Sequence, residues 1–179
     1  PSVWHKDVKM YKLIDNVSGG ILGYFYLDLF PRKGKYTGAA EYTIISGKKL
    51  DTGYQKPIAS LVCNFSAPNQ GKPSLLLHEE VETLFHEFGH LLHELLTTTE
   101  LVSQSGTSVA MDFVEMPSQI FENWVWNKKS LNLFAKHYKT GELIPEDLLD
   151  NMIEAKKVQS GNNLLQQIFY ASLDLTYFD

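Results

Sequence analysis

Two histidines four residues apart, with a glutamate directly after the first, are the residues of this chain best suited to chemistry. They form the segment His86-Glu87-Phe88-Gly89-His90, inside a stretch with helical periodicity. Residues four apart on a helix lie on one face, with their Cβ atoms about 5 to 6 Å apart. Both imidazoles can therefore bind one zinc ion, at about 2.0 to 2.1 Å from each nitrogen.

Glu87 is turned by about 100° around the helix from His86. This turn places its carboxylate beside the metal rather than on it, where a general base can take a proton from an attacking water. HExxH on a helix is the arrangement of zinc metalloproteases for this reason. Gly89 inside the motif costs about 1 kcal/mol of helix stability relative to alanine. We therefore expect a backbone segment, from substrate or a sheet, to approach it closely.

A catalytic zinc ion needs a third protein ligand and an open fourth position. His93 is a poor candidate, because it lies about 10.5 Å along the helix from His86; a packing or hydrogen-bonding role is expected for it. The polar side chains of residues 112–122 repeat at helical spacing among apolar residues. Spacing alone leaves Asp112, Glu115 and Glu122 as possible third ligands. The side chains that could orient the histidines are Asp112, Gln119 and Glu122.

The elements that must position these residues are strands followed by helices. Aromatic and β-branched runs separated by glycine and proline turns predict strands at residues 8–14, 21–30, 40–45 and 58–65. After Pro73 the apolar spacing changes to about 3.6 residues, which predicts the helix that carries the histidines, with an apolar stripe from Val81 to Leu96. Further helices are predicted at 108–137, interrupted at Pro117, and at 145–158 and 162–177. This order predicts an α+β fold, in one domain over residues 1–179.

The composition argues against several classes of protein. With a formal net charge of −5 over 179 residues, the chain offers no basic surface for nucleic acid. No segment approaches the roughly 18 apolar residues of a membrane span. Cys63, the one cysteine, lies in an apolar run and is expected to be a buried, inert thiol. A cytoplasmic location fits a chain without a disulfide.

These motifs resemble the thimet oligopeptidase family of zinc metallopeptidases, which includes neurolysin, oligopeptidase A and peptidyl-dipeptidase. The resemblance is carried by HEFGH at 86–90, Ser105-Gly106-Thr107, Asp112-Phe113-Val114-Glu115, Pro117-Ser118-Gln119, Glu122-Asn123-Trp124, and upstream by residues 24–32 and 34–36. It implies a zincin-like fold, with a small twisted sheet before the HExxH helix. It also implies one zinc ion with Glu115 as third ligand beside His86 and His90, and cleavage of short unstructured peptides.

The same family has a downstream segment whose histidine and tyrosines bind substrate, and an N-terminal helical half. This chain ends before that downstream segment and lacks most of the N-terminal helical half. We therefore expect a fragment of a larger enzyme that holds zinc but cleaves peptides poorly or not at all. Loss of one oxyanion donor typically costs about 100- to 1000-fold. We expect substrate backbone to dock along an edge strand near Gly38-Ala39-Ala40. Two alternatives stay open: a non-catalytic module with a structural zinc or bound peptide, and a solvated His/Glu face without metal.

Overall fold

The computed structural model describes residues 3–69, 71–158 and 160–178. The chain divides into two compact units, residues 1–127 and 128–179, and each is described by itself. The prediction of one domain over residues 1–179 stays a prediction.

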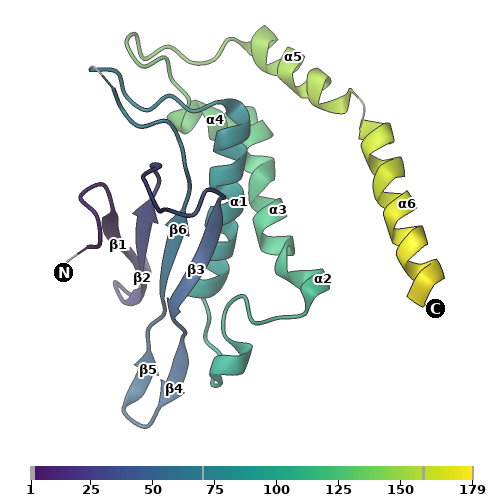
Figure 1. The fold of residues 1–179 in the computed structure, drawn as a ribbon. Helices are drawn as coiled ribbons and strands as arrows, with labels where there is room; N and C mark the ends of the chain where they lie inside the picture. The colour runs from purple at the N-terminus through teal and green to yellow at the C-terminus, as the bar shows by residue number, and fades with distance from the viewer. Residues whose placement is uncertain (1–2, 70, 159, 179) are drawn as a thin grey trace. The chain divides into compact units, whose positions relative to one another are not determined.

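The first unit is built on a four-stranded sheet with the strand order β1-β2-β6-β3. Its strands are β1 (Lys9–Ile14), β2 (Ile21–Asp28), β3 (Ala40–Ile45) and β6 (Ile58–Val62). β2 pairs antiparallel with β1 and parallel with β6, and β3 pairs antiparallel with β6. The sheet is therefore mixed, and β3 forms one of its edges (Figure 1).

All four predicted strands are present, and β2 and β6 end earlier than predicted. Their backbones still pair beyond the strand ends, because the Cys63 N–H donates to the Asp28 carbonyl and the Phe65 N–H to the Leu29 carbonyl. A short hairpin, β4 (Lys48–Leu50) and β5 (Gly53–Gln55), was not predicted. Its strands have three residues each, too few for an alternating pattern to stand out.

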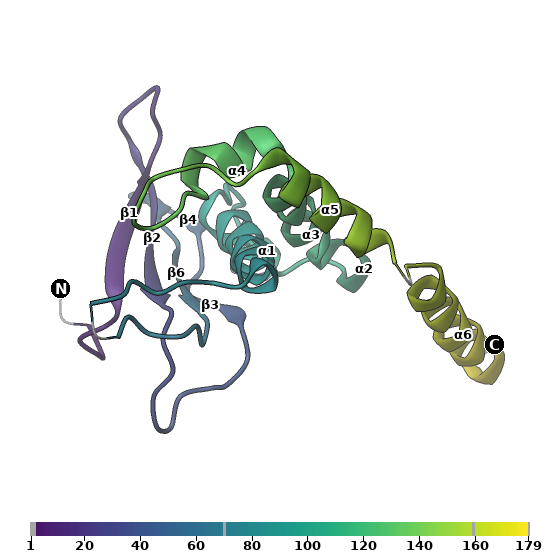
Figure 2. The ribbon, with the colours of Figure 1, turned by 90° about the horizontal axis from the view of Figure 1, so that it is seen from above.

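Helix α1 (His78–Leu95) covers one face of the sheet, and α3 (Met116–Glu122) lies on the side of α1 away from the sheet (Figure 2). The Glu80 carboxylate accepts the Leu77 N–H at 2.7 Å and so caps the start of α1. The core lies between α1 and the sheet, and its fully buried members include Ala59, Leu61, Cys63, Leu91 and Leu95. Leu96, which the predicted stripe included, is exposed because α1 ends at Leu95.

The predicted interruption near Pro117 is present. Helix α2 (Met111–Val114) ends before Glu115, and α3 begins at Met116. Pro117 lies in the first turn of α3, where its missing N–H costs no helical hydrogen bond. Two short 3₁₀ segments, η1 (Val102–Gln104) and η2 (Asn123–Trp126), complete the helical part of this unit. The α+β prediction is confirmed.

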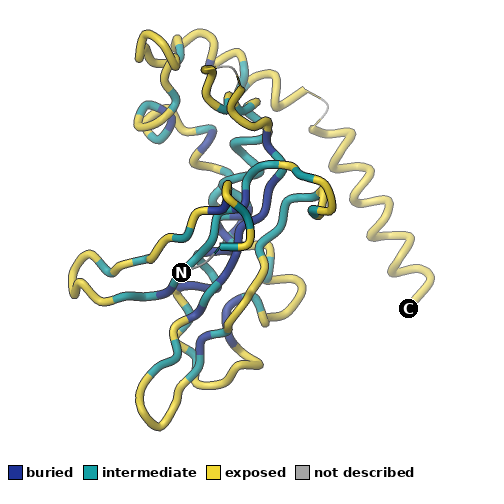
Figure 3. Tube along the Cα trace, turned by 60° about the vertical axis from the view of Figure 1, so that its left-hand side comes forward, coloured by how far each residue is buried: buried dark blue, intermediate teal, exposed yellow. Residues whose placement is uncertain are grey.

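The second unit contains α4 (Lys128–Phe134), α5 (Glu146–Lys157) and α6 (Ser160–Phe178). The last two agree with the predicted helices to within two residues at each end. Helix α6 is exposed along its described length (Figure 3). In the part of the chain that the structure describes, no helix combines the length and the apolar character needed to cross a membrane.

Cys63 has the predicted burial, with none of its surface exposed. Burial raises the pKa of its thiol to about 12, and the nearby Glu87 charge acts in the same direction. The thiol is therefore protonated at neutral pH, and a protonated, enclosed sulfur is a poor nucleophile.

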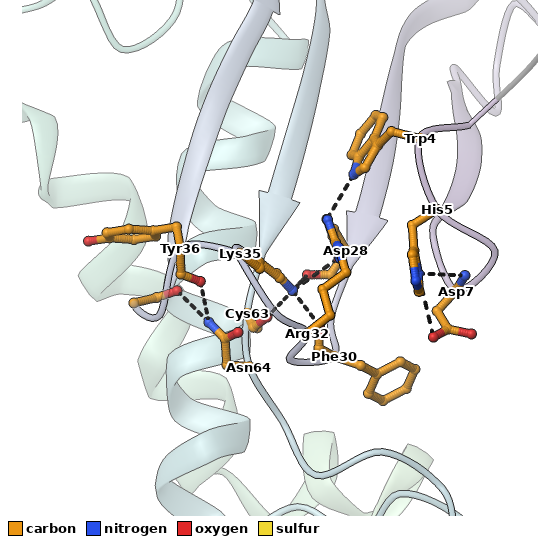
Figure 4. Close-up of polar contacts among 11 residues, drawn as sticks. Trp4, His5, Asp7, Asp28, Phe30, Arg32, Lys35, Tyr36, Cys63 and Asn64 are labelled. Atoms are coloured by element: carbon orange, nitrogen blue, oxygen red, sulfur yellow. Dashed lines mark hydrogen bonds and ion pairs between the residues drawn. The ribbon is translucent and has the colours of Figure 1, made fainter.

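A cluster of charged side chains holds the segment that leads into β3 (Figure 4). The Lys35 ammonium donates to the carbonyl oxygens of Asp28 and Phe30, at 2.7 and 2.8 Å, and to that of Cys63. Arg32 donates twice to the Asp28 carboxylate, at 2.6 and 2.8 Å. Burial acts to raise the pKa of Asp28, but hydrogen bonds from Arg32, Trp4 and Lys35 outweigh it and hold the pKa well below its usual range. Asp28 is therefore ionised and fixes both cations.

Asn64 also holds the segment that leads into the edge strand β3. Its side-chain amide donates to the carbonyl oxygens of Tyr36 and Gly38, each at 2.9 Å (Figure 4). The chain therefore enters β3 at a fixed position, and this position brings Ala39 and Ala40 to the cavity described below.

Candidate metal centre

His86 and His90 of α1 converge on the carboxylate of Glu115, which lies at the break between α2 and α3. The Nε2 atoms of the two histidines lie 3.2 and 3.1 Å from Glu115 Oε2. One ligand atom from each of the three residues lies within 4.8 Å of the others. Atoms bound tetrahedrally to one zinc ion at about 2.0 to 2.1 Å lie roughly 3.3 to 3.4 Å apart, so the three side chains fit a zinc ion.

Glu122 supports this arrangement from α3. Its Oε1 lies 2.7 Å from His86 Nδ1, on the side of the ring opposite Glu115. A carboxylate at Nδ1 favours the proton there and leaves the Nε2 lone pair free to bind a metal. Glu122 therefore has the predicted orienting position. Asp112 and Gln119 are exposed, and with Glu115 they line a second depression, together with Met116, Ile120 and Asn123.

His93 packs rather than joining the convergent group. Its ring lies 6.1 Å from the ring of Phe113, and burial lowers the pKa of its imidazole, which favours the neutral form. This placement agrees with the predicted packing role.

Gly89 allows α3 to approach α1 closely. A Cβ atom at Gly89 would lie 2.6 Å from Ser118 Cα and 2.7 Å from the Pro117 carbonyl oxygen. The Ser118 hydroxyl in turn lies 2.9 Å from Glu115 Oε2. The expected close backbone approach is confirmed, although the approaching segment is a helix rather than a strand or a substrate. It follows that the glycine sets the distance between Glu115 and the histidines.

Substituting alanine for Gly89 is expected to destabilise the protein and weaken zinc binding together. The overlap with the α3 backbone should cost about 1 to 3 kcal/mol of unfolding free energy, more than the gain of up to about 1 kcal/mol in helix propensity. Chemical denaturation and zinc titration measure the two effects. Gly161→Ala is the matched control, because a Cβ on this helical glycine meets open space. Equal stability of the two variants would contradict the proposed contact.

Glu87 lies beside the convergent ligands and is 7% exposed. Burial raises the pKa of its carboxyl, against the lowering effects of His86, His90 and the Glu41 N–H. Burial also acts to raise the pKa of Glu115, but there the hydrogen bond from Ser118 and the two histidines prevail and lower it. The pKa values of these two carboxyl groups are thus shifted in opposite directions.

A cavity of about 340 Å³ opens at this cluster. Its lining contains the predicted residues His86, Glu87, His90 and Glu115 and the predicted docking segment Ala39-Ala40, together with Glu41, Thr107 and Val114. Glu41 was not among the predicted site residues, and Thr107 was named only within the motif Ser105-Gly106-Thr107 that carries the resemblance. For Glu41 a signal existed, since alternation along residues 40–45 places it on one face with Thr43. Thr107 lies in a loop whose course no periodic pattern encodes.

Known proteins of similar sequence agree with the metal site that this geometry indicates. The model of "Peptidase family M3" matches residues 1–179. Over 175 residues the chain is 47% identical to a "Thimet-like oligopeptidase" of Dictyostelium discoideum, covering 96% of this chain and 26% of the relative. It is 45% identical to "Oligopeptidase A" of Escherichia coli, covering 96% and 25%, and 43% identical to "Saccharolysin" of Saccharomyces cerevisiae, covering 97% and 25%.

The chain thus spans about a quarter of the length of the curated relatives it matches. The resemblance to the thimet oligopeptidase family is confirmed, and so is the zincin-like arrangement of an HExxH helix packed on a sheet. A family model that covers every residue, together with the convergence of His86, His90 and Glu115, shows that this chain belongs to Peptidase family M3.

Proposed function

We propose that this chain is the metal-binding core of a zinc-dependent oligopeptidase that hydrolyses peptide bonds in short peptides. His86, His90 and Glu115 would hold one zinc ion, and the convergence of their ligand atoms is the observation that carries the proposal. The names of two relatives, "Thimet-like oligopeptidase" and "Oligopeptidase A", support the substrate class. Bound zinc would acidify a water molecule and polarise the scissile carbonyl. A cytoplasmic location, suited to the free thiol of Cys63, is part of the proposal.

Glu87 is the residue we assign as general base. Its carboxylate takes a proton from the attacking water and then delivers that proton to the leaving amine. The raised pKa of this buried carboxyl favours the first step, because such a group binds a proton more readily than an exposed carboxylate does. Glu41 lines the same cavity beside this carboxylate.

The edge strand β3 is the segment we assign to substrate docking. An extended peptide can add to an unpaired strand edge through main-chain hydrogen bonds. Ala39 and Ala40 line the cavity at this edge, and their small side chains leave room for a peptide beside Glu87. The Lys35 and Asn64 contacts described above hold this edge in place.

The number of donors favours catalysis over a structural zinc. Structural zinc sites are closed by four protein ligands, whereas catalytic sites have three and leave one position open. Within the described ranges, three donor residues group together at this site. The fourth position would then be available to water and substrate.

Metal removal tests the proposal. The whole protein should hydrolyse quenched fluorescent peptides, lose this activity on treatment with a chelator, and regain it with one equivalent of zinc. The isolated chain, which spans about a quarter of the length of its curated relatives, is expected to bind zinc with little turnover. Undiminished hydrolysis after complete removal of metal would disprove the assignment.

A further inference from the structure

Glu41 of β3 is the charged residue of the cavity lining that the chemistry proposed above does not use. The lining also contains His86, Glu87, His90 and Glu115, and each of these has a place in the proposed metal site or in proton transfer. Glu41 comes from the edge strand, and β3 packs against α1 (Figure 1). The proposed docking edge therefore brings an acidic side chain into the cavity of the metal site.

One carboxylate oxygen of Glu41 is buried without a partner. The Oε1 atom is shielded from solvent and accepts no hydrogen bond from the described residues. Most buried polar atoms in proteins do have a partner, so an exception in the lining of a cavity is a candidate acceptor for a ligand. The residue as a whole is only partly buried. A donor that enters the cavity can therefore reach this carboxyl group.

The negative charge of Glu41 would also be the one left over in the cavity. The two positive charges of the proposed zinc ion offset those of Glu115 and Glu87, and histidines bind a metal as neutral imidazoles. Neither lysine nor arginine is among the described residues that line the cavity. Burial, followed by the charges of Glu94 and Glu87, raises the pKa of Glu41 to about 8. A cation beside this carboxyl group would lower that pKa and favour the carboxylate.

The geometry of the strands indicates which part of a peptide would meet Glu41. In an antiparallel pair, side chains directly opposite each other project to the same face, with Cβ atoms about 4.5 to 5.5 Å apart. Glu41 pairs with Leu61 of β6 on one side, and a peptide docked antiparallel on the free edge of β3 would add a partner on the other side. The side chain of that substrate residue would project with Glu41 toward the cavity. A lysine or arginine side chain there can donate to the carboxylate.

We propose that Glu41 is a specificity-determining residue that binds a cationic nitrogen of the peptide substrate. The strand geometry assigns this nitrogen to a lysine or arginine side chain at one substrate position, and the free α-amine of a short peptide is the other source of the same chemistry. Hydrogen bonds between charged groups are roughly twice as strong as those between neutral groups, so this contact can select among peptides that otherwise fit equally well. The inference rests on the proposed function, because it takes the cavity to be the substrate site.

Hydrolysis of matched peptides by the whole protein tests the selection without any variant. A quenched, N-acetylated peptide is prepared with lysine or norleucine at one position after another, because norleucine keeps the aliphatic chain of lysine and lacks its charge. At one position the lysine version should have a kcat/KM about 10- to 100-fold higher. The same peptides with a free N-terminus test the α-amine. Equal kcat/KM for lysine and norleucine at every position, and for free and acetylated peptides, would overturn the proposal.

Glu41→Gln assigns the selection to its residue, because it keeps the shape of the side chain and removes the charge. In the whole protein this variant should lose most of the preference for the cationic peptide, whichever of the two nitrogens supplies the cation. Glu79→Gln makes the same change at an exposed position of α1 outside the cavity lining, and it should keep the wild-type preference. A Glu41→Gln variant with the full wild-type preference would overturn the proposal.

Peptide binding keeps the test independent of catalysis. Fluorescence anisotropy with the zinc-loaded full chain and labelled peptides of the same series should give a Kd about 10- to 100-fold lower for the lysine version at one position. Glu41→Gln should remove this difference. If the whole protein hydrolysed no peptide, the proposed function would fail, while the Kd values would still decide the role of Glu41. Equal Kd values for cationic and neutral peptides throughout the series would overturn that role.

Discussion

Replacing Glu87 with glutamine in the whole protein is expected to reduce peptide hydrolysis by about two to four orders of magnitude while zinc remains bound. Glutamine has nearly the same shape and hydrogen-bonding reach as glutamate, but it cannot take a proton from water. The proposed zinc ligands His86, His90 and Glu115 are untouched. The measurement is kcat on a quenched peptide, with zinc content determined on the same sample.

Glu79→Gln makes the same chemical change on the same helix, at an exposed position in its first turn. It should leave both kcat and zinc content at the wild-type level. If Glu87→Gln retained more than a tenth of the wild-type kcat, another group would have to serve as the base. If it lost its zinc, Glu87 would be a ligand rather than a base.

Removing one of the proposed ligands should weaken zinc binding far more than substituting a residue beside the ligands. The free energy of zinc binding in small sites is about 10 to 16 kcal/mol, so one of three protein ligands contributes roughly 3 to 5 kcal/mol. His90→Ala should therefore raise the Kd for zinc by about 10²- to 10⁴-fold. Competition titration against a coloured chelator, with the full chain, measures this change.

The chain supplies a matched comparison one helical turn away. His93→Ala removes the same side chain from α1, but His93 packs against Phe113 outside the ligand group, so zinc affinity should hold. Glu122→Gln should raise the Kd for zinc by about 10- to 100-fold, which lies between the effects of the other two variants. It loosens the orientation of His86 without removing a ligand. Similar zinc affinity for the His90 and His93 variants would contradict the ligand assignment.

Local patterns were sufficient to predict the helix that carries the motif. Spacing alone places His86 and His90 on one face of α1, and the apolar stripe of this helix predicts the surface that packs on the sheet. Pro117 likewise signals the break between α2 and α3. Each of these features depends on residues close together in the chain, where propensity and periodicity act directly.

The features that escaped prediction depend on contacts between distant segments. Spacing could not choose among Asp112, Glu115 and Glu122, because the choice is made by how closely α3 packs on α1 at Gly89. The family resemblance favoured Glu115, whose carboxylate lies 3.2 and 3.1 Å from the two histidines, and its role as a zinc ligand stays a prediction. Glu41 gained its place at the cavity from the order of the strands, which puts β3 at the edge of the sheet beside the ligands. No local pattern contains that order.

The occupancy and the ligand shell of the metal site show whether His86, His90 and Glu115 bind zinc. Zinc X-ray absorption spectroscopy on the full chain, loaded with zinc and freed of excess metal, gives both the stoichiometry and the ligand types. We expect one zinc ion per chain, bound by two imidazole nitrogens and two oxygens, one of them from Glu115 and one from water. A chain that retains no zinc, or a shell without imidazole, would contradict this ligand assignment.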